Sequence, residues 1–158
     1  MEYIFFWGEH SKDGYMSNFY PSEFTINNQK FNCSEQYFMK KKQELFDPNN
    51  ILLATNIMKE TKPKDIKKFG RQVKNFNDAI WNQHKVKEMH DGIYAKFSQN
   101  PELKLKLLST GDKILVEASP YDKIWGIGFS KDNALLNKDK WGQNLLGKVL
   151  MQVRKELH

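Results

Sequence analysis

The sequence predicts an α+β fold: one mostly helical domain spanning residues 1–158 with a small β-sheet or hairpin. Stretches with apolar residues three or four positions apart outnumber the short β-favouring runs. Strand and helix patterns do not alternate regularly, which argues against a doubly wound parallel sheet. The 158 residues are the length of one domain and are enough to bury a core.

The predicted strands are short. Residues 3–6 are aromatic and β-branched, which is typical of a strand. We expect a hairpin over residues 22–32, because Asn27-Asn28 tolerates the positive φ of a tight turn. Residues 113–119 form a further strand-like run, and IWGIGF is either a strand or a tight loop.

The helices are predicted from capping residues, prolines and apolar spacing. Ser34 is expected to cap the first helix, with Tyr37, Phe38 and Leu45 anchoring it in the core, and Asn144 to cap the last. The expected helices cover residues 34–46, 49–55, 64–74, 77–98, 101–110 and 144–158.

The composition limits the environment and the ligands. With 25 basic and 19 acidic residues the net charge is +6, which favours anionic ligands such as phosphates, nucleotides or nucleic acid. The single cysteine, Cys33, excludes an internal disulfide and is expected to be buried. No apolar run approaches the roughly 20 residues that span a bilayer, and the N-terminus lacks the features of a secretory signal. We therefore expect a cytoplasmic protein without a membrane partner. The four histidines have no metal-ligand spacing, so neither a metal nor a cofactor is expected.

Glu35 and Lys42 are the first candidates for catalysis. They lie seven residues apart, about two helical turns, and so share one face of the predicted helix. Burial and the neighbouring Lys40 and Lys41 are expected to lower the pKa of Lys42, and a partly neutral lysine is a nucleophile. Ordinary helix capping by Glu35 and a solvated lysine face are the alternative interpretation.

A second group of candidates lies near the C-terminal strand. Glu117 and Asp122 are acids in an apolar segment, Trp125 could stack on a base, and Gly126 permits close backbone approach. A plain strand followed by a turn explains the same pattern equally well.

Three further residues are candidates for substrate binding. Asn18 offers an amide to a base edge and Phe19 a ring to its face, although the pair also suits a simple turn. Asn144 begins the last helix, whose N-terminus could receive a phosphate.

Taken in order along the chain, these segments resemble the NADAR family, also called YbiA-like. The resemblance rests on FWGEHS, SNFYP, SEQYF followed by Lys42, FGRQV, Trp81, KFSQN, LVEAS, IWGIG and the final WGQNLLG segment. Members of this family are N-glycosidases: one branch acts on ribosylamino-pyrimidine intermediates of riboflavin synthesis, and another removes ADP-ribose from guanine in nucleic acid.

The resemblance implies roles for particular residues. Glu35 matches the family glutamate, and Lys42 matches a lysine implicated in a Schiff base with the sugar C1. Glu117, Asp122, Trp125, Gly126 and Asn144 match as well. Met39 and Lys40 replace the usual Gln-Ala, and Lys85 stands where an arginine is common. Because lysine lacks the bidentate fork of arginine, the last departure bears on substrate affinity.

The resulting hypothesis is cleavage of a C1–N bond, in which Glu35, Asp122 or Glu117 stabilises positive charge on the sugar and Lys42 attacks C1. The substrate is a ribosylamino-pyrimidine phosphate or, alternatively, an ADP-ribosylated guanine in DNA or RNA. Two hypotheses without turnover compete with it. One is a module that only binds ADP-ribose or a nucleotide, and the second is generic nucleic-acid binding, which predicts a steep salt dependence.

Overall fold

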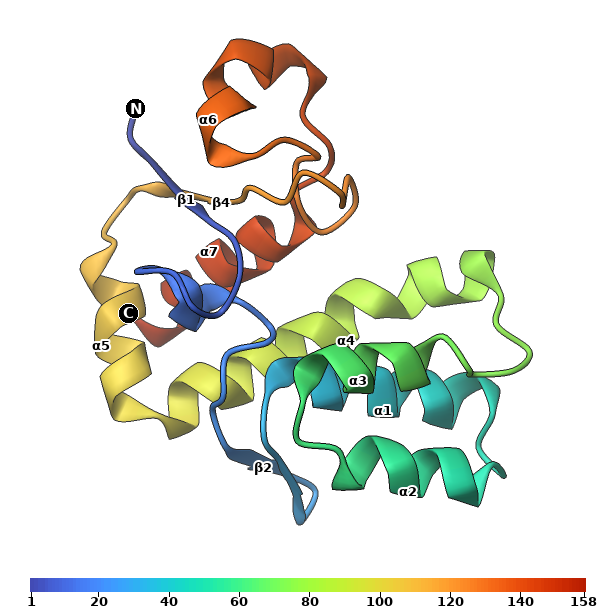
Figure 1. Cartoon of the computed structure of the whole chain (residues 1–158). Helices are drawn as coiled ribbons and strands as arrows, with labels where there is room; N and C mark the ends of the chain where they lie inside the picture. Colours follow the sequence, from blue (N-terminus) through green and yellow to red (C-terminus); the bar gives the residue numbers. More distant parts are fainter. The chain divides into compact units, whose positions relative to one another are not determined.

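The computed structural model describes all of residues 1–158 and confirms the α+β class, with seven α-helices, two 3₁₀ helices and four short strands (Figure 1). The chain divides into two compact units. We name them by their place in the sequence: the terminal unit comprises Met1–Tyr20 and Pro101–His158, and the central unit comprises Pro21–Asn100. The prediction of a single domain stays a prediction.

The terminal unit is built on a parallel pair of strands. β1 (Tyr3–Phe6) pairs with β4 (Ile114–Glu117) in a register that places Phe6 opposite Glu117. Helix α7 (Leu145–Leu157) packs against β4, and α5 (Pro101–Ser109) packs against α7 (Figure 1). The buried face of α7 carries Leu146, Val149, Leu150 and Val153, at the three- and four-residue spacing of a helix that packs one side against a core.

Short helical turns complete the terminal unit. They are η1 (Gly14–Met16), α6 (Lys131–Ala134) and η2 (Leu135–Lys140), and the sequence predicted none of them. Trp141 follows η2 and donates its indole N–H to the Ala134 carbonyl at 2.8 Å. These turns lack an apolar period, so no pattern marks them.

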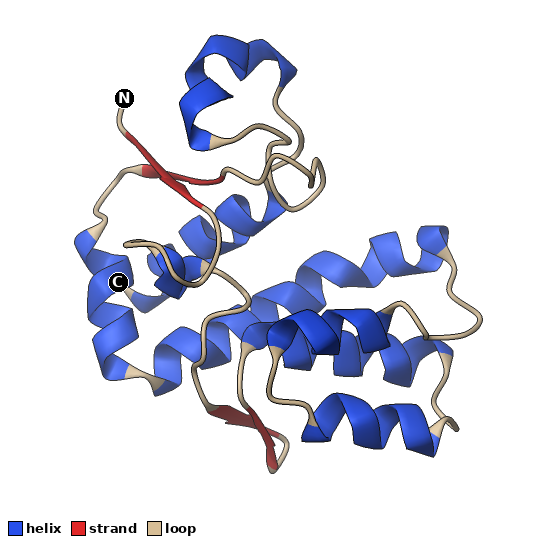
Figure 2. Cartoon of the chain, viewed as in Figure 1, coloured by secondary structure: helices blue, strands red, loops and turns tan.

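The central unit begins with the predicted hairpin. β2 (Phe24–Ile26) and β3 (Gln29–Phe31) are antiparallel, and both sheets of the molecule have only two strands (Figure 2). Asn27 and Asn28 have φ of 52° and 64°, the positive values that the turn requires. The hairpin is therefore confirmed.

Four helices form the rest of the central unit. They are α1 (Ser34–Phe46), α2 (Ile51–Lys59), α3 (Pro63–Gly70) and α4 (Asp78–Gln99). Helix α1 contacts each of the other three (Figure 1). Eight of the 13 residues of α1, Phe46 among them, are buried. This helix is therefore the central packing element of the unit and fixes the position of the side chains that it carries.

Details of α1 and α3 differ from the predictions. Ser34 does not cap α1: Cys33 occupies the N-cap position without a side-chain cap bond, and the Gln36 side chain reaches back to accept from the Asn32 N–H at 2.8 Å. Leu45 does not anchor α1, because it is 38% exposed. Helix α3 ends at Gly70, four residues earlier than predicted.

No helix of the structure has both the length and the apolar character needed to cross a membrane.

Candidate active site

The nine predicted site residues fall in both units. Glu35 and Lys42 belong to α1 of the central unit. The other seven belong to the terminal unit and are Asn18, Phe19, Glu117, Asp122, Trp125, Gly126 and Asn144.

Lys42 is half-buried and held from outside its own helix. Its ammonium donates to the carbonyl oxygen of Gly70 at 2.9 Å and lies 4.7 Å from the centroid of the Phe76 ring. Gly70 ends α3, and its carbonyl also accepts from the Val73 N–H at the longer distance of 3.5 Å, so the lysine is the closer of its two donors. These contacts hold the nitrogen in a defined position.

Burial is the main cause that lowers the pKa of Lys42 below its ordinary value. Glu35 and Asp78 act in the opposite direction, and the positive charge of Arg71 adds to the lowering. The predicted direction is therefore confirmed. The predicted like charges are not the cause, because the cation that acts on Lys42 is Arg71, 29 positions further along the chain.

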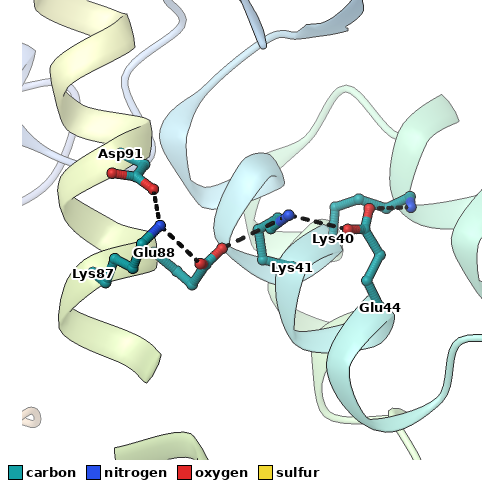
Figure 3. Close-up of polar contacts among 6 residues, drawn as sticks. All are labelled: Lys40, Lys41, Glu44, Lys87, Glu88 and Asp91. Carbon is teal, nitrogen blue, oxygen red and sulfur yellow. Dashed lines mark hydrogen bonds and ion pairs between the residues drawn. The ribbon is translucent and has the colours of Figure 1, made fainter. Parts of the chain in front are cut away.

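Lys40 and Lys41 are engaged elsewhere, in a chain of ion pairs between α1 and α4 (Figure 3). Both lie close to Glu44, at 2.7 Å from Lys40 and 3.2 Å from Lys41. Lys41 also approaches Glu88 at 3.9 Å, and Glu88 approaches Lys87. Burial would raise the pKa of Glu44, but its bonds to the two lysines outweigh burial and lower it. Of the three consecutive lysines, Lys40 and Lys41 are thus paired with a carboxylate, whereas Lys42 bonds a backbone carbonyl.

Glu35 is buried, with 7% of its surface exposed, in the first turn of α1. It is close enough to Lys42 for its charge to raise the pKa of that lysine. The structure therefore brings together the two residues that the helical spacing predicted to share a face.

A second lysine of the central unit also has a lowered pKa, and it was not among the predicted site residues. Lys96 on α4 is completely buried, and burial lowers its pKa to about 7, while Cys33 acts in the opposite direction. Burial also raises the pKa of the Cys33 thiol to about 11. The available signal was the place of Lys96 between Ile93 and Phe97, on the buried face of its helix.

In the terminal unit, Asp122 organises the loop that follows β4. Its Oδ1 accepts from the backbone N–H groups of Ile124 at 2.8 Å and Trp125 at 2.9 Å. The Ser119 hydroxyl accepts in turn from the N–H groups of Tyr121 and Asp122. Such side-chain turns fix the backbone locally. At least one oxygen of the Asp122 carboxylate therefore stabilises the backbone conformation of this loop.

Asn144 joins this loop to β4 and to α7. Its Oδ1 accepts from the Glu117 N–H at 3.0 Å, and its Nδ2 donates to the Leu115 carbonyl at 3.0 Å. It occupies the N-cap position of α7 with φ of 52° but makes no side-chain cap bond. The predicted capping role is wrong, because the amide bonds a strand 27 and 29 residues away.

Close backbone contacts explain two glycines of this unit. A Cβ on Gly126 would lie 2.8 Å from the Glu117 carbonyl oxygen and 3.0 Å from that of Asp122. A Cβ on Gly147 in α7 would collide with the Leu115 carbonyl and the Asn144 amide. The absent side chains let α7 and the 122–127 loop approach the end of β4. The close approach predicted at Gly126 is thus to the protein's own backbone.

The remaining candidates lie in the same unit. Trp125 is half-buried in the Asp122 turn, and its carbonyl accepts from the Leu146 N–H at 3.0 Å. Asn18 and Phe19 are half-buried in a different turn, after η1, where the Phe19 N–H donates to the Ser17 hydroxyl at 3.1 Å. Their roles in substrate binding stay predictions.

The chemistry available to the α1 pair is covalent and electrostatic. A lysine of lowered pKa is more often the neutral amine, which can attack an electrophilic carbon. A buried carboxylate nearby can stabilise positive charge in a site of low dielectric.

The class of protein is defined by the sequence as a whole. Residues 5–158 match the NADAR domain, and the chain belongs to this family.

Relatives match along almost the full length. The N-glycosidase R617 of Acanthamoeba polyphaga mimivirus is 42% identical over 165 residues, covering 98% of this chain and 96% of that protein. A riboflavin biosynthesis protein of Vibrio vulnificus is 30% identical, covering 98% of this chain and 38% of that protein. The NMR structure of the E. coli protein YbiA has a TM-score of 0.80 and 28% identity, covering 99% of this chain and 84% of that one.

Proposed function

We propose that this chain is an N-glycosidase that hydrolyses the C1–N bond of a ribosylamino-pyrimidine phosphate. The observation that carries the proposal is the pair of Glu35 and Lys42 on α1, where a half-buried lysine of lowered pKa stands near a buried carboxylate. Full-length relatives named N-glycosidase support the reaction, and relatives named riboflavin biosynthesis protein support the substrate.

Lys42 is the proposed nucleophile. The neutral amine attacks C1 of the ring-opened sugar, and the C1–N bond to the base breaks as the base leaves with a proton. This gives a protonated Schiff base between Nζ and C1, which water hydrolyses to free sugar phosphate and lysine. The Gly70 carbonyl accepts one N–H of Lys42, which leaves the lone pair of the neutral amine available for attack.

Carboxylates assist the bond cleavage. Positive charge develops at C1 as the bond to the base breaks, and a carboxylate close to C1 lowers the energy of that state. Glu35 is the proposed stabilising group because its charge already acts on Lys42. Glu117 and Asp122 are proposed as further acid–base groups, although Asp122 also holds the backbone of its loop.

Base recognition is assigned to aromatic and amide groups. The family resemblance supports Trp125 and Phe19 as residues that stack on the base and Asn18 as the residue that hydrogen-bonds its edge. Gly126 and Asn144 would contribute by shaping the backbone after β4, because their contacts are with Glu117 and Leu115.

The second candidate substrate is ADP-ribosylated guanine in nucleic acid. The net charge of +6 favours it, since a polyanion gains more than a small phosphate from a basic surface. A binding module without turnover is the alternative outside the enzymes, and a nucleophilic lysine has no purpose in such a module.

The deciding experiment is a paired turnover assay. One reaction contains the ribosylamino-pyrimidine phosphate, and the other contains ADP-ribosylated guanine in a short oligonucleotide. Each is run with the native protein, with Lys42→Ala and with Lys41→Ala. Lys41 is the matched control, because it is the adjacent half-buried lysine on α1 but is paired with Glu44.

We expect release of ribose phosphate from the first substrate and a loss of at least about 10³-fold in Lys42→Ala, with Lys41→Ala close to native. Borohydride should trap a sugar adduct on the native chain and on Lys41→Ala, but not on Lys42→Ala. Release of ADP-ribose from the second substrate alone would overturn the proposed substrate. Full activity of Lys42→Ala would overturn the mechanism.

A further inference from the structure

The terminal unit contains a cavity of about 510 Å³ that none of the nine predicted site residues lines. It lies where β1 and β4 end: Trp7 follows β1, and the N–H of Ala118, which follows β4, donates to the Phe6 carbonyl at 2.8 Å. The carboxyl ends of parallel strands are a common place for ligand sites, and the volume suits a small molecule. The cavity is thus a candidate binding site in its own right.

Trp7 is the most unusual residue of the cavity lining. Its side chain is 51% exposed, although an indole is among the largest apolar groups of a protein. Tyr121, which is 84% exposed, packs against it with ring centroids 6.0 Å apart at 62°. The two rings form an aromatic corner at the carboxyl ends of the strands. A planar ring of a ligand gains stacking energy on such a surface.

The polar lining complements a phosphorylated sugar. Lys12 and Lys131 line the same cavity and supply two ammonium groups, which suit a phosphate dianion. Asp13 and Asp132 also line it, and carboxylates commonly accept hydrogen bonds from ribose hydroxyls. The Ser130 hydroxyl, another lining group, accepts from Asn133 at 3.3 Å and can donate its own proton.

From these groups we infer that the cavity binds a nucleoside monophosphate. The base stacks on Trp7 beside Tyr121, the phosphate contacts Lys12 and Lys131, and the ribose lies near the two aspartates. The inference goes beyond the proposed reaction and does not depend on Lys42.

Binding of AMP tests the inference. Titration calorimetry on the full chain should give a dissociation constant below about 1 mM, with adenosine and inorganic phosphate each binding at least tenfold more weakly. Trp7→Ala should weaken AMP binding about tenfold or more, and Trp7→Phe, which keeps a ring, should weaken it less. Because Trp7 is half exposed, both variants should keep the native circular dichroism spectrum.

A double lysine variant and its control separate the contribution of charge to AMP binding from that of stacking. A double Lys12→Gln, Lys131→Gln variant should lose about tenfold in affinity for AMP and nothing for adenosine. Lys140→Gln is the matched control, because this exposed lysine in η2 does not line the cavity. Unchanged AMP affinity in both Trp7→Ala and the double variant would overturn the inference, as would the absence of AMP binding to the native chain.

A short oligodeoxynucleotide without terminal phosphates distinguishes a polymer from a mononucleotide. If the oligonucleotide binds in a Trp7-dependent manner and AMP does not bind, the inference of a mononucleotide site would be overturned in favour of a site for single-stranded nucleic acid. Turnover measured in parallel separates the two proposals. Native turnover in Trp7→Ala with weakened AMP binding supports the cavity site, while loss of glycosidase activity in Lys42→Ala reports only on the proposed reaction.

Discussion

Polar side chains are used differently in the two units. On α1 of the central unit, the charge of Glu35 raises the pKa of Lys42, and Lys42 bonds a carbonyl with its ammonium group. In the terminal unit, Asp122 and Asn144 are largely occupied with backbone N–H and C=O groups. Both regions contain residues that resemble family site residues, and the lysine of lowered pKa near a buried carboxylate lies in the first.

The difference teaches which measurement should respond to each substitution. Changing an ionisable group of α1 should change reactivity at almost constant stability. Changing an amide or carboxylate that bonds the backbone should lower stability first, and activity only through misplaced backbone. Substitutions in both units test this separation, and the largest effect is expected on α1.

That largest effect is expected for Glu35→Gln. The substitution preserves shape but removes the negative charge near Lys42. Turnover should fall by roughly 10²–10⁴-fold, since stabilisation of the developing cation is lost. The urea unfolding free energy should change by less than about 1 kcal/mol. A stability loss larger than that, with turnover preserved, would break the comparison.

Asn144→Ala should reverse this pattern. It leaves the Leu115 carbonyl and the Glu117 N–H without the side-chain bonds that each now makes at 3.0 Å. The expected loss is about 2–4 kcal/mol in urea unfolding. Asn133→Ala, at an exposed position of α6, is the control and should change stability by less than about 0.5 kcal/mol. Equal stabilities of the two variants would contradict the structural role of the Asn144 side chain.

Lys96→Met should change how stability depends on pH. The pKa of Lys96 is about 7 in the folded chain against an ordinary value of 10.5, so the unfolded chain binds more protons between these values. Native stability should therefore contain a term that rises with pH above about 7, by up to roughly 1.4 kcal/mol per pH unit. Lys96→Met should remove that term.

Urea unfolding at pH 7.0, 7.8 and 8.5 measures this difference. The range stays below the ordinary pKa of 9.0 of Cys33, whose raised pKa has the opposite effect at higher pH. Parallel pH slopes for the native and Lys96→Met chains would show that Lys96 does not titrate as described.

The smallest effects are opposite shifts in the pH–rate profile. If neutral Lys42 is the nucleophile, the rate rises with pH through its lowered pKa. Arg71→Gln removes a charge that lowers this pKa, so the profile should move to higher pH. Asp78→Asn removes a charge that raises it, so the profile should move to lower pH. Shifts in the same direction would refute the electrostatic assignment around Lys42.

Local patterns in the sequence predicted most elements of the fold. The hairpin followed from Asn27-Asn28, because positive φ is a property of the turn residues themselves. The common face of Glu35 and Lys42 followed from helical geometry alone. Each of these depends on residues a few positions apart.

Features that depend on distant contacts were not predictable. The partner of Lys42 is the Gly70 carbonyl, 28 residues away, and the partners of Asn144 lie on β4. The sequence therefore indicated that Asn144 begins a helix, but not that its side chain bonds β4. Lys96 has a position in the buried stripe of α4, but its complete burial depends on the packing around that helix.

The connectivity of β1 and β4 has a consequence for the order of folding. Their pairing joins Tyr3 to Ile114, so during synthesis the terminal unit cannot form until its second half has emerged. The central unit is one continuous segment, Pro21–Asn100, whose shorter loops close at lower entropic cost. We expect its amides to gain protection first in pulsed hydrogen exchange during refolding, while earlier protection of β1 would contradict this order. On a ribosome, the helix that presents Lys42 would then fold before α7 has been synthesised.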